Sequence, residues 1–393
     1  MKIFRTLPTK RLILLLVGAA IVAIGGASIA VAAGGSGSTP PATSLPNAIH
    51  DALTAQKPTG VTARIDFTNK LFPSGSLLGQ ATSALMSGAS GRLWANSTGG
   101  RLELQSDAGD VQITWNDTKL TVYDASSNTA YTFDLPQQQS STTTTPGQPP
   151  SLDQITTFLN DLGKDWNISD AQPDNVAGQQ AYTVTISPSH DGGLLGSAQL
   201  AWDAMNGVPL KVEIYAQGSS TPALALDVTD ISFGDVADSD VHVTPPAGAK
   251  IVDLSSQASG QTGGTSSAPA VTGLAAVQAA ASFPVTAPDS LVGLARRDVR
   301  LVGPTDSRSA ISVYGQGLGA IIVVERANDS SSGAPAQLQA LPTVSLDNGT
   351  VTAHELSTQL GTVLTWNKGG VSYILAGSVP SSAAEAAAAA LNQ

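Results

Sequence analysis

Histidines, aspartates and closely spaced glycines are the residues of this chain whose types could do chemistry. His50, His190, His242 and His354 lie far apart in the sequence. Glu355 follows His354 directly, but no second histidine stands four residues on, so the zinc-protease pattern of two histidines on one helix face is not present. We interpret the four histidines as surface residues rather than as metal ligands.

Three aspartates and one glycine-rich loop are the next candidates. Asp235, Asp238 and Asp240 could offer carboxylate oxygens to calcium, but neither the EF-hand spacing nor its closing glutamate follows them. We interpret them as a solvated turn, with weak calcium binding as the alternative. The loop GQGLG at 315–319 imitates a dinucleotide-binding loop, yet strand patterns flank it on both sides, where a pyrophosphate site needs a helix N-terminus. A hairpin turn is the favoured interpretation.

The composition excludes several classes of function. The chain has no cysteine, which removes thiol nucleophiles, disulfides and thiolate metal sites. No Gly-x-Ser-x-Gly or Ser-x-x-Lys pattern of a serine hydrolase stands out. Only 12% of the 393 residues are charged and the net charge is −11, whereas nucleic-acid binding depends on neutralising phosphates. We therefore expect no catalytic residue, no metal, no cofactor and no nucleic-acid partner.

The first 33 residues are typical of an export segment. Leu12 to Ala33 is an uncharged run of 22 residues, and the bases Lys2, Arg5, Lys10 and Arg11 precede it. The run is long enough to span a bilayer, which favours an uncleaved anchor with a cytoplasmic N-terminus. The alternative is a signal peptide cleaved near Ala33, where Val31 and Ala33 supply small residues. In both cases the rest of the chain lies outside the cytoplasm.

The middle of the chain has the pattern of a β-rich domain. After a linker at 34–46, we expect a domain at 47–253 with about nine strands and two or three helices. A helix at 47–56, capped by Asn47, precedes a strand at 61–68, and five short strands form a meander over 91–135. A mobile insert at 136–150 leads to a helix with Ser151 and Gln154 at capping-box spacing. The clearest hairpin is Ser197 to Gln217, whose five-residue loop ends in Asn-Gly.

A second flexible linker, at 254–281, separates a smaller domain at 282–393. Strand patterns at 310–314, 320–326, 350–356, 361–366 and 371–376 precede an alanine-rich helix. Ser382 and Glu385 stand at capping-box spacing before that helix. These patterns predict a small α+β domain of about 110 residues.

Several motifs of the first domain occur in the order found in a known superfamily. They are GRLW at 91–94, KLTVYD at 119–124, VAGQQAY at 176–182, WD at 202–203 with GVPL at 207–210, and PPAGA at 245–249. In this respect the chain resembles the LolA-like superfamily of lipoprotein carriers, LppX-type envelope lipoproteins and RseB-type stress regulators. The resemblance implies an incomplete antiparallel β-barrel with a helical lid, whose concave apolar face holds acyl chains.

The second domain resembles a small domain of unknown function found in bacterial envelope and anti-sigma-type proteins. The residues that carry this likeness are FPV at 283–285, VY at 313–314, LTW at 364–366 and YILAG at 373–377. The likeness brings no known chemistry with it. An anchor segment, the insert at 136–150 and this extra domain set the chain apart from freely diffusing carriers.

The segment 71–86 is apolar without a clean strand period. It could be ordinary core, or a lid over a cavity, and the resemblance favours the lid. We expect an apolar cavity and its lid to be lined by Leu71, Phe72, Leu77, Leu78, Leu85, Met86, Trp94, Phe158, Leu159, Leu200, Trp202 and Val212.

Together these features predict a non-enzymatic, extracytoplasmic protein of the bacterial cell envelope that binds the acyl chain of a lipid or lipoprotein. Each buried methylene would contribute about 0.8 kcal/mol, so no charged partner is required. The alternative is a sensing or regulatory module, RseB-like or associated with an anti-sigma protein, that docks on another envelope protein. The membrane is a further expected partner, through the N-terminal segment.

Overall fold

The structure is a computed structural model that describes residues 38–71, 84–135, 149–190, 192–255, 271–303, 308–328 and 341–392. The predicted membrane or signal segment at 1–33 lies outside the described residues. So do 34–37 of the first predicted linker, 136–148 of the predicted insert and 256–270 of the second linker. Within the described part of the chain, no helix combines the length and the apolar composition that a membrane crossing requires.

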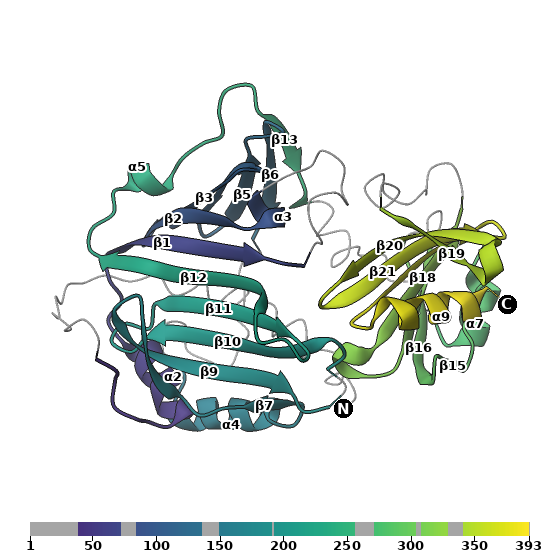
Figure 1. The fold of residues 1–393 in the computed structure, drawn as a ribbon, viewed down its shortest axis with the longest axis horizontal. Coiled ribbons are helices and arrows are strands. Elements are labelled where there is room, and N and C mark those ends of the chain that lie inside the picture. The colour runs from purple at the N-terminus through teal and green to yellow at the C-terminus, as the bar shows by residue number, and fades with distance from the viewer. Residues whose placement is uncertain are drawn as a thin grey trace.

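The first half of the chain folds into one open sheet of 13 strands (Figure 1). Its order is β13-β6-β5-β4-β3-β2-β1-β12-β11-β10-β9-β7, with β8 paired to β9. The strands are β1 Gly60–Asn69, β2 Ala89–Asn96, β3 Gly99–Ser106, β4 Gly109–Trp115, β5 Lys119–Asp124, β6 Thr129–Asp134, β7 Trp166–Ile168, β8 Gln172–Val176, β9 Gln179–Pro188, β10 Leu195–Asp203, β11 Pro209–Ala216, β12 Pro222–Phe233 and β13 Lys250–Asp253. All neighbours are antiparallel except β13 and β6.

The predicted meander and hairpin are confirmed by this sheet. Strands β2 to β6 are consecutive antiparallel neighbours, and β10 and β11 flank the Asn206-Gly207 turn, where Gly207 has φ +70°. Register shifts interrupt the pairing at Arg64/Ile65, Ala201/Trp202 and Ile214/Tyr215. Such bulges bend a strand and increase its twist, so the sheet curves. Its outer strands β13 and β7 do not pair, and the barrel is not closed.

Two helices lie on the β7–β10 end of the sheet, α2 (Leu45–Thr54) and α4 (Leu152–Leu162). The capping box of Ser151 and Gln154 is present in α4, as predicted. The predicted cap of α2 was wrong, because Ser44, not Asn47, is the N-cap and its hydroxyl accepts the Asn47 N–H. Two four-residue helices, α3 (Ala84–Ser87) and α5 (Asp238–Val241), complete this part of the chain.

The second sheet has nine strands in the order β14-β16-β17-β18-β22-β21-β20-β19, with β15 paired to β16. The strands are β14 Val271–Thr272, β15 Ser290–Leu291, β16 Leu294–Val302, β17 Ser309–Tyr314, β18 Ile321–Ala327, β19 Thr343–Leu346, β20 Val351–Thr358, β21 Gly361–Lys368 and β22 Val371–Gly377. The GQGLG loop holds the short 3-10 helix η2 (Gly317–Gly319) between the antiparallel strands β17 and β18, so it is a hairpin connection. A second one, η3 (Asp347–Gly349), follows β19.

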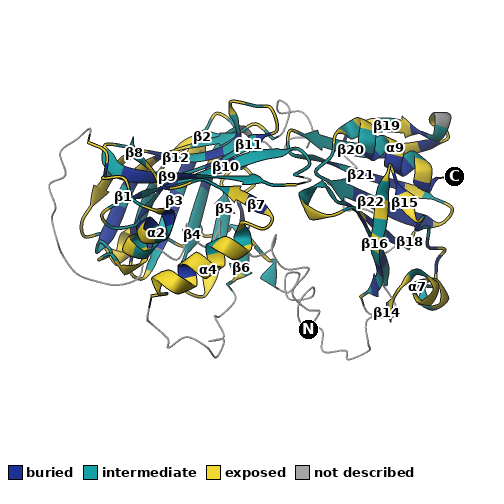
Figure 2. Ribbon diagram, turned by 90° about the horizontal axis from the view of Figure 1, so that it is seen from below, coloured by how far each residue is buried: buried dark blue, intermediate teal, exposed yellow. Residues whose placement is uncertain are grey.

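Helices α7 (Leu274–Ala280) and α9 (Ser381–Leu391) cover one face of the second sheet. The predicted capping box of Ser382 and Glu385 was wrong: α9 begins at Ser381 after Pro380, without a side-chain cap. Its alanines instead bury their methyl groups against the sheet. Trp366 is 2% exposed, stacks on Tyr373 at 4.9 Å between ring centroids and donates from Nε1 to Asn392 Oδ1 at 3.0 Å. Figure 2 shows buried residues along the strands of both sheets and a largely exposed α4.

Candidate functional site

One face of the first sheet is apolar from strand to strand. Directly opposed residues form a row of Ala63, Leu93, Leu102, Ile113 and Val122 across β1 to β5. Because side chains alternate along a strand, all members of such a row point to the same side of the sheet. This row marks the apolar side, and the residues between its members point to the other side.

We call the half-buried part of this side the open apolar face. Its side chains pack on a buried cluster that includes Ile65, Leu104 and Val111, but they are not themselves buried. They come from β1, β2, β4, β5 and β12, and they are Phe67, Leu93, Ile113, Trp115, Val122 and Leu226. Large apolar side chains that remain partly exposed and form one continuous surface are typical of a binding site.

Helix α3 lies on the open apolar face, packed against β1, β3 and β4. Ala84 is fully buried there and Leu85 packs against the apolar cluster. The side chain of Asn69, at the end of β1, holds this arrangement: its Nδ2 donates to Leu85 O at 2.7 Å, and its Oδ1 accepts the Leu71 N–H at 2.9 Å. One amide therefore ties both described ends of the predicted lid segment to β1.

Trp115 lies flat on the sheet because its cross-strand partner is Gly100. A Cβ at residue 100 would stand 2.0 Å from the indole Cζ2, closer than any real contact. Glycine thus creates the space in which the largest side chain of the open apolar face rests.

We expect Gly100→Ala to displace the Trp115 indole and to destabilise the first domain by about 1–3 kcal/mol, the usual cost of overpacking. Urea unfolding followed by tryptophan fluorescence measures this loss. Gly234→Ala is the matched control, because Gly234 has nothing within 4 Å of its Cβ position and its φ is not positive. Equal destabilisation by the two substitutions would contradict the packing argument.

The opposite face of the first sheet is polar, and Trp94 belongs to it. Trp94 pairs with Arg101, whose guanidinium carbon lies 4.4 Å from the indole centroid, and Arg101 also pairs with Glu103 at 2.7 Å. Strand alternation sends Leu93, its neighbour, to the apolar side, so Trp94 is not part of the open apolar face. That Trp94 contacts a ligand stays a prediction.

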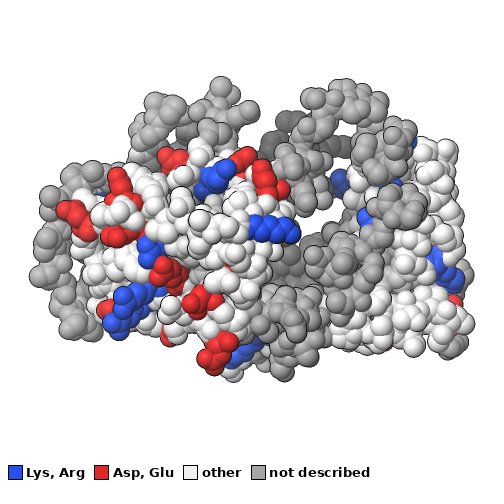
Figure 3. Space-filling model, turned by 90° about the horizontal axis from the view of Figure 1, so that it is seen from above, with Lys and Arg blue, Asp and Glu red and all other residues white. Residues whose placement is uncertain are grey.

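Charged groups gather on this polar face along β11 and β12. Burial raises the pKa of Asp227, and the nearby Glu213 carboxylate raises it further. Tyr215 donates to Glu213 Oε2 at 2.8 Å, and burial together with that bond raises the pKa of Tyr215 to about 12. In the view of Figure 3, acidic and basic side chains are intermixed on the first domain without a patch of one sign. Ionisable chemistry and the open apolar face therefore lie on opposite sides of the sheet.

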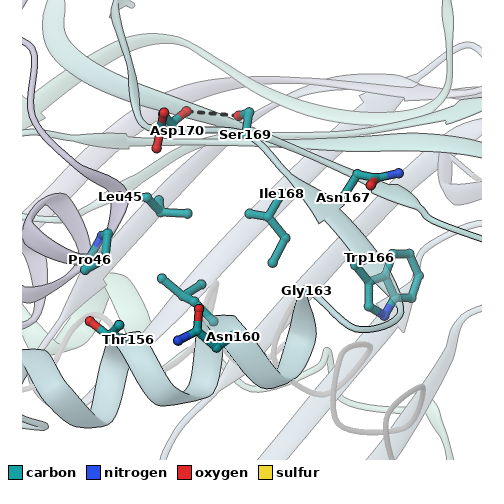
Figure 4. Close-up of a pocket in the computed structure, with 11 residues that line it drawn as sticks. Leu45, Pro46, Thr156, Asn160, Gly163, Trp166, Asn167, Ile168, Ser169 and Asp170 are labelled. Carbon is teal, nitrogen blue, oxygen red and sulfur yellow. Dashed lines mark hydrogen bonds between the residues drawn. The ribbon is translucent and has the colours of Figure 1, made fainter.

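A pocket lies between α2, α4 and β7 (Figure 4). This pocket of about 400 Å³ has an apolar wall that includes Leu45, Leu159 and Ile168, with Asn160 and Asp170 among its polar groups. Ser169 Oγ donates to the Asp170 carbonyl at 2.9 Å. The lining mixes apolar side chains with polar groups, as is usual for sites that bind small molecules.

The residues under α2 and α4 form a separate apolar cluster. Leu200 and Trp202 of β10 pack with Leu159 against a buried cluster that includes Leu45, Tyr182 and Val184. These residues support the sheet rather than line the open apolar face. Phe158 is 47% exposed and is not a member of this cluster, and its contact with a ligand stays a prediction. Helical geometry puts it at the edge of the stripe that Ile155 and Leu159 bury.

Of the other predicted site residues, Leu85 lies on the open apolar face, Met86 is half-buried on the same helix, and Leu71 follows the end of β1. Val212 pairs with Leu226 and so extends the apolar side toward β11. Phe72, Leu77 and Leu78 lie outside the described residues. That these side chains contact a ligand remains a prediction.

Among the remaining polar candidates, Asp238 and His242 both form a hydrogen bond with the Thr98 hydroxyl. The carboxylate of Asp238 accepts from Asn96 and Thr98, both at 2.9 Å, whereas that of Asp235 accepts from Thr59 at 2.7 Å. In the parts of the chain that the structure describes, no three histidine or acidic side chains are grouped as a metal site would need.

None of the six side chains that define the open apolar face was among the predicted site residues. Phe67, Ile113 and Trp115 each have polar neighbours on both sides, which is the signal that could have found them. Leu93 and Leu226 each have one apolar neighbour, so alternation gives a weaker signal for them. The alternation of apolar and polar residues along a strand does not show which side of the sheet the helices cover. The cross-strand pairing in the structure shows that these residues lie on one surface.

Comparison with known proteins gives distant structural likenesses. No family model and no curated protein matches the chain. Among solved structures, MucB in complex with MucA(peri) is 14% identical, with a TM-score of 0.41, over 88% of this chain and 97% of that one. An uncharacterized conserved protein from Thermus thermophilus is 9% identical, with a TM-score of 0.32, over 53% of this chain and 96% of that one.

A putative outer membrane lipoprotein-sorting protein domain from Vibrio parahaemolyticus is 11% identical, with a TM-score of 0.19, over 47% of this chain and 89% of that one. Likenesses at these scores carry no argument about activity, so function is argued from the residues.

Proposed function

We propose that this protein is a non-enzymatic, extracytoplasmic binding protein whose first sheet holds the acyl chain of a lipid or lipoprotein. The observation that carries the proposal is the open apolar face. Its six side chains are half-buried. Among the described residues, helix α3 packs on β1, β3 and β4, and helices α2 and α4 pack at the β7–β10 end of the sheet.

An acyl chain would fit this surface by burial alone. Each methylene removed from water contributes about 0.8 kcal/mol, and the chain would also cover the accessible parts of Phe67, Trp115 and Leu226. The ionisable groups of β11 and β12 lie on the other side of the sheet, so a bound hydrocarbon would displace no charge from water.

The location outside the cytoplasm and the membrane anchor are also proposals, and both rest on residues 1–33. The bases followed by the 22-residue uncharged run of Leu12 to Ala33 support an uncleaved anchor. An anchor would keep the open apolar face close to a bilayer, which is where acyl chains are found.

A regulatory interaction module is the second candidate. The observation in its favour is an aliphatic surface on the side of the second sheet opposite α7 and α9. Ile322 is 43% exposed there, and its cross-strand partners are Val313 and Ala376. A protein partner could cover such a surface.

Native mass spectrometry of the full chain in mild detergent tests the first candidate. We expect co-purified lipid or acylated peptide that leaves the protein as a discrete mass. Protein that carries no lipid, and that takes up no added fatty acid after delipidation, would contradict acyl binding. A defined protein partner captured by the delipidated chain would favour the second candidate.

A further inference from the structure

The two sheets touch at one small patch of the second domain. Leu194 N, in the turn between β9 and β10, donates to both the carbonyl and the Oγ of Ser378, each at 3.0 Å. Ser378 directly follows β22. In Figure 1 the ends of β20 and β21 point toward the first sheet at this place.

The same patch also reaches β1. Ser378 Oγ donates to Leu360 O at 2.7 Å, and the adjacent Gln359 donates from Nε2 to Lys70 O at 3.3 Å. We call Gln359, Leu360 and Ser378 the clasp. The clasp therefore holds two parts of the first domain that are far apart in the sequence, the end of β1 and the β9–β10 turn.

Close backbone approach at the clasp requires glycine at residue 193. Gly193 has φ +59°, and a Cβ on it would stand 2.1 Å from the carbonyl oxygen of Ser378 and 2.8 Å from its Oγ. No side chain fits in that space. Leu194 O accepts the Gln217 N–H at 2.7 Å, which joins the β11–β12 turn to the same contact.

The clasp connects to the open apolar face through neighbouring residues of β1. Gln359 holds the carbonyl of Lys70, and the preceding residue, Asn69, holds helix α3 through Leu85 O at 2.7 Å. Helix α3 packs on β1, β3 and β4. A shift of the second domain at the clasp would therefore displace Lys70, and Lys70 is bonded directly to Asn69, the residue that holds α3.

We propose that the clasp is an intramolecular latch: it docks the second domain on one end of the first sheet and, through Lys70 and Asn69, sets how firmly α3 covers the open apolar face. The docking is independent of any ligand. The effect on α3 rests on the proposed acyl-binding function, because its expected result is slower exchange of a bound acyl chain when the clasp is formed.

Gly193→Ala against Gly218→Ala tests the docking in the full chain. Gly218 also has a positive φ, +75°, and lies in the β11–β12 turn at the same end of the sheet, but nothing stands within 4 Å of its Cβ position. Because the chain has no cysteine, spin labels can be placed through Ser220→Cys and Thr352→Cys, both at exposed positions. We expect a longer and broader label distance in Gly193→Ala and the parent distance in Gly218→Ala.

A parent distance in Gly193→Ala, or the same change in both variants, would overturn the latch. The double substitution Gln359→Ala with Ser378→Ala provides a second route if Gly193→Ala folds poorly, and it should also lengthen the label distance. Dissociation of a fluorescent fatty acid then tests the effect on α3, with faster release expected from the unlatched variants. Unchanged release with separated domains would overturn that effect alone. Absence of fatty-acid binding in the parent protein would count against the proposed function while the label distances still decide the latch.

Discussion

Val122→Glu should weaken the binding of a fluorescent fatty acid by at least about a hundredfold. Val122 lies on the open apolar face, in the row that runs from Ala63 through Leu93 and Ile113. A bound acyl chain would enclose the new carboxylate in hydrocarbon, which costs several kcal/mol per ion. Each 1.4 kcal/mol of that cost is about a factor of ten in the dissociation constant.

Thr121→Glu is the matched control, because it places the same charge one residue away on the polar face of β5. Thr121 pairs with Thr114 and Thr132, and all three point away from the apolar row. Its fatty-acid affinity should equal that of the parent protein. If both variants bind equally well, or if both lose binding equally while remaining folded, the open apolar face is not the site.

Glu325→Gln should remove a pH dependence from the stability of the second domain. Glu325 of β18 is fully buried, and burial raises its pKa to about 7 from an ordinary value of 4.5, against the lowering effect of the hydrogen bond from Thr286 N at 2.8 Å. Its other oxygen, Oε1, has no hydrogen-bond partner within the described residues. The side chains near it include those of Tyr314 and Tyr373, which are neutral below their own raised pKa values.

The sign follows from the direction of this shift. A carboxyl group with a higher pKa in the folded state binds its proton more tightly there, so its contribution to stability is complete below pH 4.5 and is lost as the pH rises through 7. The loss should reach about 3 kcal/mol. Urea unfolding read by amide hydrogen exchange in β18, β21 and β22 at pH 5 and pH 8 measures it.

Glu325→Gln should show little of this loss of stability between pH 5 and pH 8. Asp298→Asn, at an ion pair with Arg300 on the same sheet, should show the same loss as the parent protein. A parent domain that is as stable at pH 8 as at pH 5 would show that Glu325 is not held neutral by burial.

Local sequence signals predicted the elements of the fold well. The capping box at Ser151 and Gln154, the Asn206-Gly207 turn and the alternation of β2 to β6 are each decided within a few residues, and the structure has all three. Asn47 was wrong as a cap because Ser44, three residues earlier, caps α2 instead. Ser382 was wrong because α9 begins at Ser381 after Pro380 with no side-chain cap.

The surface that the sheet leaves accessible was harder to predict, because it depends on contacts between distant segments. Trp94 and Leu93 are adjacent and both apolar, and only the pairing of Leu93 with Ala63 shows which of them faces the core. Likewise, Leu200 and Trp202 have the pattern of a cavity wall, but α2, which lies far earlier in the chain, covers them. Glu325 sits within the aliphatic strand IIVVERA, and nothing in that pattern shows that its carboxyl group is buried.

Photo-crosslinking would show where on the first sheet a bound acyl chain lies. The full chain would be loaded with a fatty acid carrying a diazirine near its terminal methyl group, irradiated and mapped by peptide mass spectrometry. We expect adducts on β1 to β5, β12 and α3, with loss of those adducts in Val122→Glu and their retention in Thr121→Glu. Adducts confined to the pocket between α2 and α4, or to the second domain, would contradict acyl binding on the open apolar face.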